Sequence, residues 1–232
     1  PRSSSAASDV YKRQVFVFYI LLRKELKELY GSLTAYVIVA AFLLLVAYTF
    51  TSILFFQRSV TMIHAFAQAA TVLIMVTPII TLRQFSAERE SGAFELLLTT
   101  PVSEIAIVLA KYIASLTLLL TMLVLSLVFP ATLQWLSQPE FGHMLSGYIG
   151  LFLLGAALLA LTTCLAAWLR NAIVAAIIGL LLNILFWTFE SLAYVAPAGR
   201  GAWFSQLIEE LSFDIRFSRF ISGALYLSDC MF

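Results

Sequence analysis

The chain has 232 residues, of which 62% are hydrophobic and only 12% charged, and its mean hydropathy is +0.97. A soluble domain is about half apolar and about a quarter charged, so this composition excludes a soluble enzyme. The 19 Phe, 9 Tyr and 4 Trp exclude a disordered chain, and the net charge of +1 excludes a nucleic-acid binder, which needs a clustered basic surface. We therefore predict an all-α fold, a polytopic helical membrane protein.

Residues 1–14 (PRSSSAASDVYKRQ) are polar and rich in Ser and Ala, unlike everything that follows. They are either a native tail or a remnant of cloning or sequence assembly. We favour the remnant and exclude these residues from fold reasoning. Residues 15–232 are predicted to form a single transmembrane domain.

Residues 15–30 combine an apolar start with the charged run RKELKELY. A helix here places apolar side chains at steps of three and four residues on one face, and Arg23, Lys24 and Lys27 on the other, with Lys24 and Glu28 as an i,i+4 pair. The segment is too short and too polar for a first span, which is the alternative. We predict a helix in the membrane surface, with its cations among lipid phosphates. The apolar face consists of Tyr19, Leu22, Leu26, Leu29 and Leu33.

Five later segments are apolar enough to cross the hydrocarbon layer, which takes about 20 residues of helix. Small residues in them, such as Gly150, Gly155, Ala156, Ala160 and Gly179, allow helices to approach closely and are expected to mark packing faces. The predicted spans are residues 34–56, 62–82, 105–133, 145–169 and 171–195.

The distribution of Lys and Arg predicts the orientation of these spans. Ten cations precede the first span, lie between spans two and three (counted through Lys111, near the start of span three), or separate spans four and five, whereas four lie in the alternate segments. Cytoplasmic segments carry the excess of Lys and Arg, so the N-terminus is predicted in the cytoplasm. Residues 196–220 should then lie outside, and the apolar stretch that begins at Phe220 leads us to expect a sixth span beyond Phe232.

Residues 83–101 (RQFSAERESGAFELLLTTP) form the longest stretch between two spans on the predicted cytoplasmic side. Ser86 can start a short helix with carboxylates near its N-terminus, Gly92 interrupts it, and Pro101, Ser103 and Glu104 start the next span. The alternative is a solvated connector, which the charges alone slightly favour.

The order RKELKELYGSLTAYV followed by RQFSAERESGAFELLLTTPVSEIAIVLAKYIA resembles the permease subunits of type-2 ABC exporters. The resemblance is closest to the gliding-motility-associated and nitrous-oxide-reductase-maturation permeases, and the order of spans extends it over nearly the whole chain from residue 15. The matching residues are Glu88-Arg89-Glu90, Gly92-Ala93, Glu95, a run of Leu at 96–98, Pro101-Val102-Ser103 and Lys111.

The resemblance implies a permease domain with six spans and an N-terminal elbow helix. A separate cytoplasmic ABC ATPase subunit binds ATP, since the sequence has no GxxxxGK[ST] motif, and no cofactor is bound by this chain. The permease pairs with a second copy or a related permease in the cytoplasmic (inner) membrane. Residues 85–99 become the coupling segment that docks on the ATPase. Its contacts are expected from Glu88, Arg89, Glu90, Gly92 and Glu95, with Phe94 and Leu97 as anchors to the spans.

Other polar residues have modest expected roles. Lys111 can extend back to the cytoplasmic phosphates along its stem. Asn183 and Gln68 could hydrogen-bond between helices or line a path. His64 is expected to pack without a metal, and Glu190 to reach water near the outer end of its span.

Two other classes of function stay open. A non-transporting assembly or anchoring subunit fits the same composition. An intramembrane enzyme would need a convergent set of acids, or a Ser with a His, within the spans, and no span offers one. The substrate cannot be deduced from the sequence.

Overall fold

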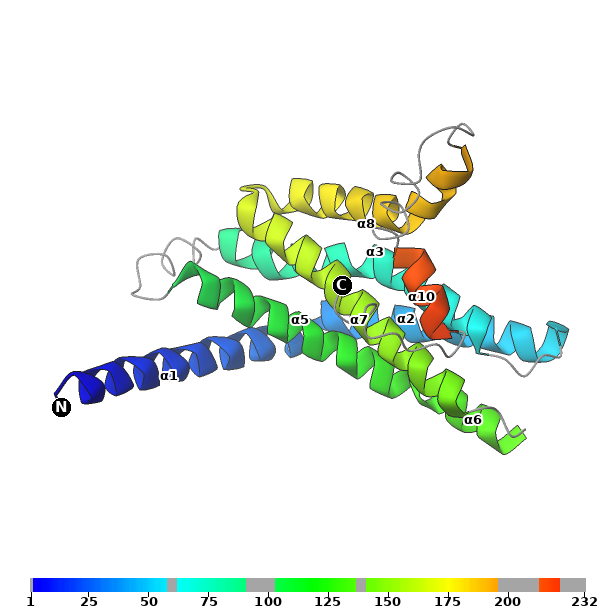
Figure 1. The fold of residues 1–232 in the computed structure, drawn as a ribbon, viewed down its shortest axis with the longest axis horizontal. Coiled ribbons are helices and arrows are strands. Elements are labelled where there is room, and N and C mark those ends of the chain that lie inside the picture. Colours follow the sequence, from blue (N-terminus) through cyan, green and yellow to red (C-terminus); the bar gives the residue numbers. More distant parts are fainter. Residues whose placement is uncertain (1, 58–61, 91–102, 137–140, 196–212, 222–232) are drawn as a thin grey trace.

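The computed structural model describes residues 2–57, 62–90, 103–136, 141–195 and 213–221. These residues form helices and contain no strand (Figure 1). The prediction of an all-α, polytopic membrane protein with five spans is confirmed. A sixth span would lie outside the described residues. The stretches long and apolar enough to cross a membrane are Leu33–Phe55, Ile63–Ser86, Glu104–Trp135, Gly142–Trp168 and Ala172–Phe189.

The elbow helix is α1 (Arg2–Tyr30), and the first span is α2 (Leu33–Ser52), which continues into a π-helical turn, η1 (Ile53–Gln57). The helix begins at Arg2 instead of residue 15, so residues that we treated as a tail are helical. It ends where Gly31 donates its N–H to the Lys27 carbonyl over 2.9 Å, as glycine commonly does at helix ends.

The second span, α3 (Ile63–Glu90), runs past its predicted end at residue 82. The prediction that Ser86 starts a separate helix is wrong, because no Gly or Pro interrupts the chain between Pro78 and Gly92. The first residues of the coupling segment therefore continue the span. Residues 91–99 of that segment lie outside the described residues.

The predicted third span is divided into α5 (Glu104–Ser126) and α6 (Val128–Leu136). Ser103 caps α5, its hydroxyl accepting from the Ala106 N–H over 3.4 Å, as predicted for the start of this span. The break follows from Pro130, which has no N–H to donate to the carbonyl four residues earlier. That carbonyl belongs to Ser126 and accepts a hydrogen bond over 3.0 Å from the Tyr148 hydroxyl of α7 (Phe141–Trp168).

Pro78 in α3 has the same effect on the carbonyl of Ile74. The side-chain amide of Asn183, on α8 (Ala172–Val195), donates to this carbonyl over 3.3 Å and to the Thr77 hydroxyl over 3.0 Å. Of the two roles left open for Asn183, the structure therefore shows the hydrogen bond between helices. Gln68 is half-buried and His64 is exposed, whereas the side chain of Glu190 is not described.

The helices α7 (Phe141–Trp168) and α8 (Ala172–Val195) complete the bundle, and α7 packs against α3, α5, α8 and α10 (Phe213–Ile221). Three glycines let α7 approach its neighbours. Gly147 lies against the Phe66 ring of α3, Gly150 against Phe220 of α10 and Gly155 against Leu119 of α5.

Gly179 of α8 lies against Thr162 of α7, so the expected packing role holds at Gly150, Gly155 and Gly179. The carbonyl of Ala156 accepts the Tyr112 hydroxyl of α5 over 3.1 Å. Ala160, in contrast, is exposed.

Helix directions define two ends of the bundle. The α3–α5 end is where α3 ends and α5 begins, and α1 lies beside it; the α6–α7 end is opposite (Figure 1). Phe217 and Phe220 of α10 are buried against the bundle. Residues 196–212 lie outside the described residues, so the outer position of residues 196–220 stays a prediction. The core between the ends includes Phe42, Leu73, Leu118 and Leu158, all fully buried.

Candidate functional site

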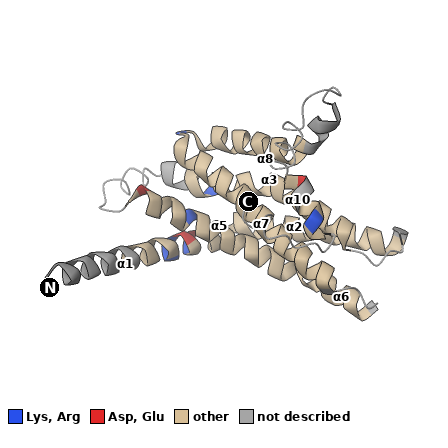
Figure 2. Cartoon of the chain, in the orientation of Figure 1, with Lys and Arg blue, Asp and Glu red and all other residues tan. Residues whose placement is uncertain are grey.

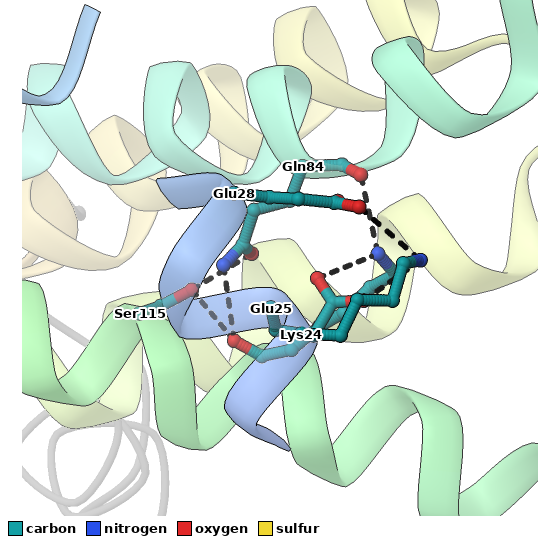
Figure 3. A network of polar contacts seen from close by, with 6 residues as sticks. Lys24, Glu25, Glu28, Gln84 and Ser115 are labelled. Carbon is teal, nitrogen blue, oxygen red and sulfur yellow. Dashed lines mark hydrogen bonds and ion pairs between the residues drawn. The ribbon is translucent and has the colours of Figure 1, made fainter. Parts of the chain in front are cut away.

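A group of buried polar residues joins α1, α3 and α5 at the α3–α5 end (Figure 3). We call Glu25, Gln84, Lys111 and Ser115 the polar cluster. Glu25 enters it because it lies on one helical face with Leu21 and Leu29, and this face is buried against the bundle. Lys111 enters it from the buried face of α5.

Lys111 is the centre of the polar cluster. Its ammonium group donates to Glu25 Oε2 over 3.0 Å and to the Gln84 carbonyl over 3.2 Å. The Lys111 side chain is 0% exposed and that of Glu25 only 4%. The prediction that Lys111 extends to lipid phosphates is therefore wrong, because a carboxylate from α1 meets the charge inside the bundle.

Gln84 and Lys111 are joined by two reciprocal hydrogen bonds. Its amide donates to the Lys111 carbonyl over 3.2 Å, so the side chain of each residue bonds the main chain of the other. The Ser115 hydroxyl donates to Gln84 Oε1 over 2.9 Å and lies 3.0 Å from the Lys111 carbonyl. Buried polar groups that are mutually satisfied in this way hold their elements rigidly.

Phe85, which follows Gln84, connects the polar cluster to α7 and α8. The Lys111 ammonium lies 5.3 Å from the centre of the Phe85 ring, within the range of a cation–π interaction. The ring is fully buried against three alanines, Ala166 at the end of α7 and Ala172 and Ala175 at the start of α8. Their small side chains leave room for the ring.

Lys24 and Glu28 form the exposed rim of the site. The ammonium of Lys24 lies 3.6 Å from Glu28 Oε1 and 3.8 Å from Glu25 Oε1. The predicted i,i+4 pair is confirmed. Arg23 and Lys27 are exposed on the same helix, as predicted. The expected apolar face is only partly buried, since Tyr19 and Leu33 are exposed and Leu21 is buried instead.

The residues predicted to dock on an ATPase follow Gln84 of the polar cluster in the sequence. Glu88, Arg89 and Glu90 are in the last turns of α3, but their side chains are not described. The others lie outside the described residues, and their roles stay predictions. These are Gly92, Phe94, Glu95 and Leu97.

Sequence reasoning missed Glu25 and Gln84. Glu25 carried a usable signal, because an acid four residues from Leu21 and four from Leu29 must share their face. A lysine two turns inside an apolar span was the matching signal for a buried partner. Gln84 carried no signal of its own.

The polar cluster contains no nucleophile with an adjacent base. Among the described residues, no three His, Cys, Asp or Glu side chains lie close enough together to hold a metal ion. What this arrangement can do is fix three helices to one another at the base of the loop between α3 and α5.

Comparison with known proteins places this architecture in a family. Residues 56–208 match the sequence profile of the ABC-2 family transporter proteins, which covers more than half of the chain. The chain belongs to the ABC-2 family. No curated protein and no solved structure gives a significant match.

An ABC-2 family chain is the membrane-spanning permease component of an ABC transporter, and such components associate in general with a cytoplasmic ATPase. The broad prediction of a type-2 ABC permease is thus confirmed. The narrower resemblance to gliding-motility and nitrous-oxide-reductase-maturation permeases stays a prediction. The matched stretch contains Gln84, Lys111 and Ser115, whereas Glu25 precedes it.

Proposed function

We propose that this ABC-2 chain is the permease subunit of an ATP-driven exporter in the cytoplasmic membrane. It couples ATP binding and hydrolysis on a separate ATPase subunit to movement of a substrate, and it works as a pair with a second copy or a related permease. The family match carries the proposal, because the matched residues run from α3 through α8 and include the loop between α3 and α5.

The charge distribution supports a cytoplasmic α3–α5 end. Most of the described Lys and Arg residues belong to segments at this end, and cytoplasmic segments carry such an excess (Figure 2). These cations are Arg23, Lys24 and Lys27 on α1, Arg83 on α3, Lys111 on α5 and Arg170 between α7 and α8. Arg219, in contrast, belongs to α10, which lies away from this end.

The coupling segment, residues 85–99, is proposed as the docking element for the ATPase. It starts next to the polar cluster, because Phe85 directly follows Gln84 in the sequence. A displacement of the segment by the ATPase would therefore be transmitted to α1, α3 and α5 together. The sequence has no phosphate-binding loop of its own, which supports ATP binding on the partner. For the ATPase to change the conformation of the permease, the two conformations of the permease must differ in their contacts with the ATPase.

A double charge reversal tests the docking role. Glu88→Lys with Glu90→Lys places two cations where two anions are proposed to face the ATPase, and like charges across an interface cost several kcal/mol. The variant should still insert in the membrane, but it should fail to co-purify with the ATPase and to stimulate ATP turnover.

The matched control is Glu209→Lys with Glu210→Lys, in the segment proposed to lie outside, and this variant should bind the ATPase normally. If the outer pair abolishes ATPase binding while the loop pair does not, the coupling segment has been assigned wrongly. Binding of the ATPase without any nucleotide-driven change in the permease would instead favour an anchoring subunit.

A further inference from the structure

The polar cluster is the principal link between α3 and α5. Elsewhere in the described residues these two helices make few direct contacts, because α7 packs between much of their lengths. At the α3–α5 end, Gln84 and Lys111 bond reciprocally across the two stems of the loop that contains the coupling segment. The cluster therefore closes the base of this loop.

The same lysine holds the elbow helix. Around this contact, α1 meets α5 through apolar side chains, Leu21 against Ile107 and Ala110, whereas the ion pair between Lys111 and Glu25 is the charged contact. Removing one member of a buried ion pair leaves the other charge uncompensated away from water, which is strongly unfavourable. The pair should therefore stay intact through any movement of these helices.

We infer that Lys111 is a positioning residue that makes the elbow helix and the base of the coupling loop one mechanical unit. When the coupling segment moves on the ATPase, α1 moves with it and does not hinge independently on the membrane surface. The inference rests on the proposed function for its trigger, but the joint itself is a property of this chain.

A distance measurement tests the joint without any partner. Spin labels are placed at Arg23→Cys on α1 and Arg83→Cys on α3, both exposed, in a chain with Cys164→Ala and Cys230→Ala, reconstituted in lipid nanodiscs. The otherwise unchanged chain should give one narrow distance. Lys111→Met should broaden it, because the ion pair between α1 and α5 is lost and the Lys24 ammonium that stays near Glu25 belongs to α1 itself.

Lys111→Arg keeps a cation that can donate to both Glu25 and the Gln84 carbonyl, and should keep the distance narrow. Lys27→Met removes an exposed cation from the same helix and should change nothing. A narrow distance in Lys111→Met, or an equal broadening in Lys27→Met, would overturn the joint. If Lys111→Met does not fold, Glu25→Gln decides, because it removes the charge on the α1 side: a distance as narrow as in the unaltered chain overturns the joint.

A covalent bridge tests movement as one unit, in the complex with the ATPase. Leu21→Cys and Ala110→Cys, in the chain with Cys164→Ala and Cys230→Ala, lie in one buried apolar cluster between α1 and α5, so the bridge is formed between them as a disulfide with a mild oxidant. Joining them should leave ATP turnover of the complex unchanged. Lys111→Met should lose the stimulation of turnover by the permease, and the bridge should restore it.

Loss of turnover on bridging the unaltered pair would show that α1 must hinge against α5, and would overturn the inference. Full stimulation of ATP turnover by Lys111→Met without the bridge would also overturn the inference. Co-purification separates the two proposals: a chain that never binds the ATPase contradicts the proposed function and the shared movement, while the nanodisc distances still report on the joint.

Discussion

Lys111 shows how one charged side chain can be kept inside an apolar bundle. Its ammonium group meets a carboxylate at 3.0 Å, a main-chain carbonyl at 3.2 Å and the face of a Phe85 ring at 5.3 Å, so its charge is compensated on several sides. Glu25, Gln84 and the ring come from two other helices. At the scale of residues, the pair is a connection and not a source of stability in itself, because desolvation offsets much of the attraction.

This balance gives the first prediction. Glu25→Leu and Lys111→Met should each lower the free energy of unfolding by about 3–5 kcal/mol, because each removes one member of a buried ion pair. The double variant should lose far less than the sum, since two apolar side chains of similar size need no partner. Reversible unfolding in mixed micelles measures all three.

The exposed pair of Lys24 and Glu28 is the matched control, with side chains 35% and 53% exposed. Lys24→Met with Glu28→Leu should show a coupling energy of no more than about 1 kcal/mol, as water already screens the charges. Additive losses at Glu25 and Lys111 would contradict a tight pair.

At the scale of helices, two spans contain a proline, and a neighbouring helix satisfies the carbonyl that each proline leaves free. Asn183 of α8 bonds the Ile74 carbonyl released by Pro78, and Tyr148 of α7 bonds the Ser126 carbonyl released by Pro130. In a membrane no water can take over these bonds. Proline therefore makes each span depend on one polar side chain elsewhere.

The dependence of Asn183 on Pro78 is testable as a cycle. Asn183→Leu should cost about 1–3 kcal/mol of unfolding free energy, because the Ile74 carbonyl stays buried without a partner. In a Pro78→Ala background the helix regains its own N–H donor, so the same change should cost less.

Thr188→Val in the same helix is a suitable comparison. That hydroxyl is exposed and bonds only its own helix, to the Ile184 and Leu185 carbonyls, so its loss should change unfolding by less than about 0.5 kcal/mol. An equal cost for Asn183→Leu with and without Pro78 would show that the amide serves some other group.

Gly150 and Gly142 of α7 form a second matched pair. A Cβ at Gly150 would lie 2.6 Å from the Cβ of Phe220, which is fixed to the backbone of α10, whereas a Cβ at Gly142 would meet no neighbouring side chain of the described residues within 4 Å. Gly150→Ala should therefore lower stability by about 1–3 kcal/mol through overpacking, and Gly142→Ala should not. Thermal unfolding in detergent, with proteolysis after Arg219 as a probe of α10, would detect the difference; equal stability would mean that α10 does not pack here.

At the scale of the whole molecule, the α3–α5 end collects most of the described cations, whereas the apolar faces between the ends are exposed to whatever surrounds the bundle. Exposed side chains such as Leu44 on α2 and Ile177 on α8 would be unfavourable in water. In a bilayer such side chains contact lipid, where their exposure carries no such cost.

The proposed orientation predicts opposite labelling of two loops. Single cysteines at Ser91 and Ser137, in a chain with Cys164→Ala and Cys230→Ala, should react with a membrane-impermeant thiol reagent from opposite sides. Ser91→Cys should react only in inside-out vesicles, because the proposed orientation has the α3–α5 end, with its excess of Lys and Arg, in the cytoplasm. Labelling of both from one side would contradict the topology.

Much of this architecture follows from the sequence alone, because hydropathy and helix capping are local properties. Short stretches of sequence predict several of its features. These are the five spans, the cap at Ser103, the pair of Lys24 with Glu28 and the excess of cations at one end. The division of the third span has a local cause too, Pro130. The donor for the Ser126 carbonyl that this proline leaves free is Tyr148 of another helix, which no local pattern predicts.

Tertiary structure alone decided which polar groups meet. Lys111 and Glu25 are 86 residues apart, and Asn183 lies 109 residues from Ile74, so no local pattern names either partner. A lysine near the end of a span can reach lipid phosphates or turn inward, and the choice depends on whether packing brings a carboxylate to it. Here α1 crosses α5 where Glu25 lies on its buried face, and that crossing turned a predicted membrane contact into the joint between three helices.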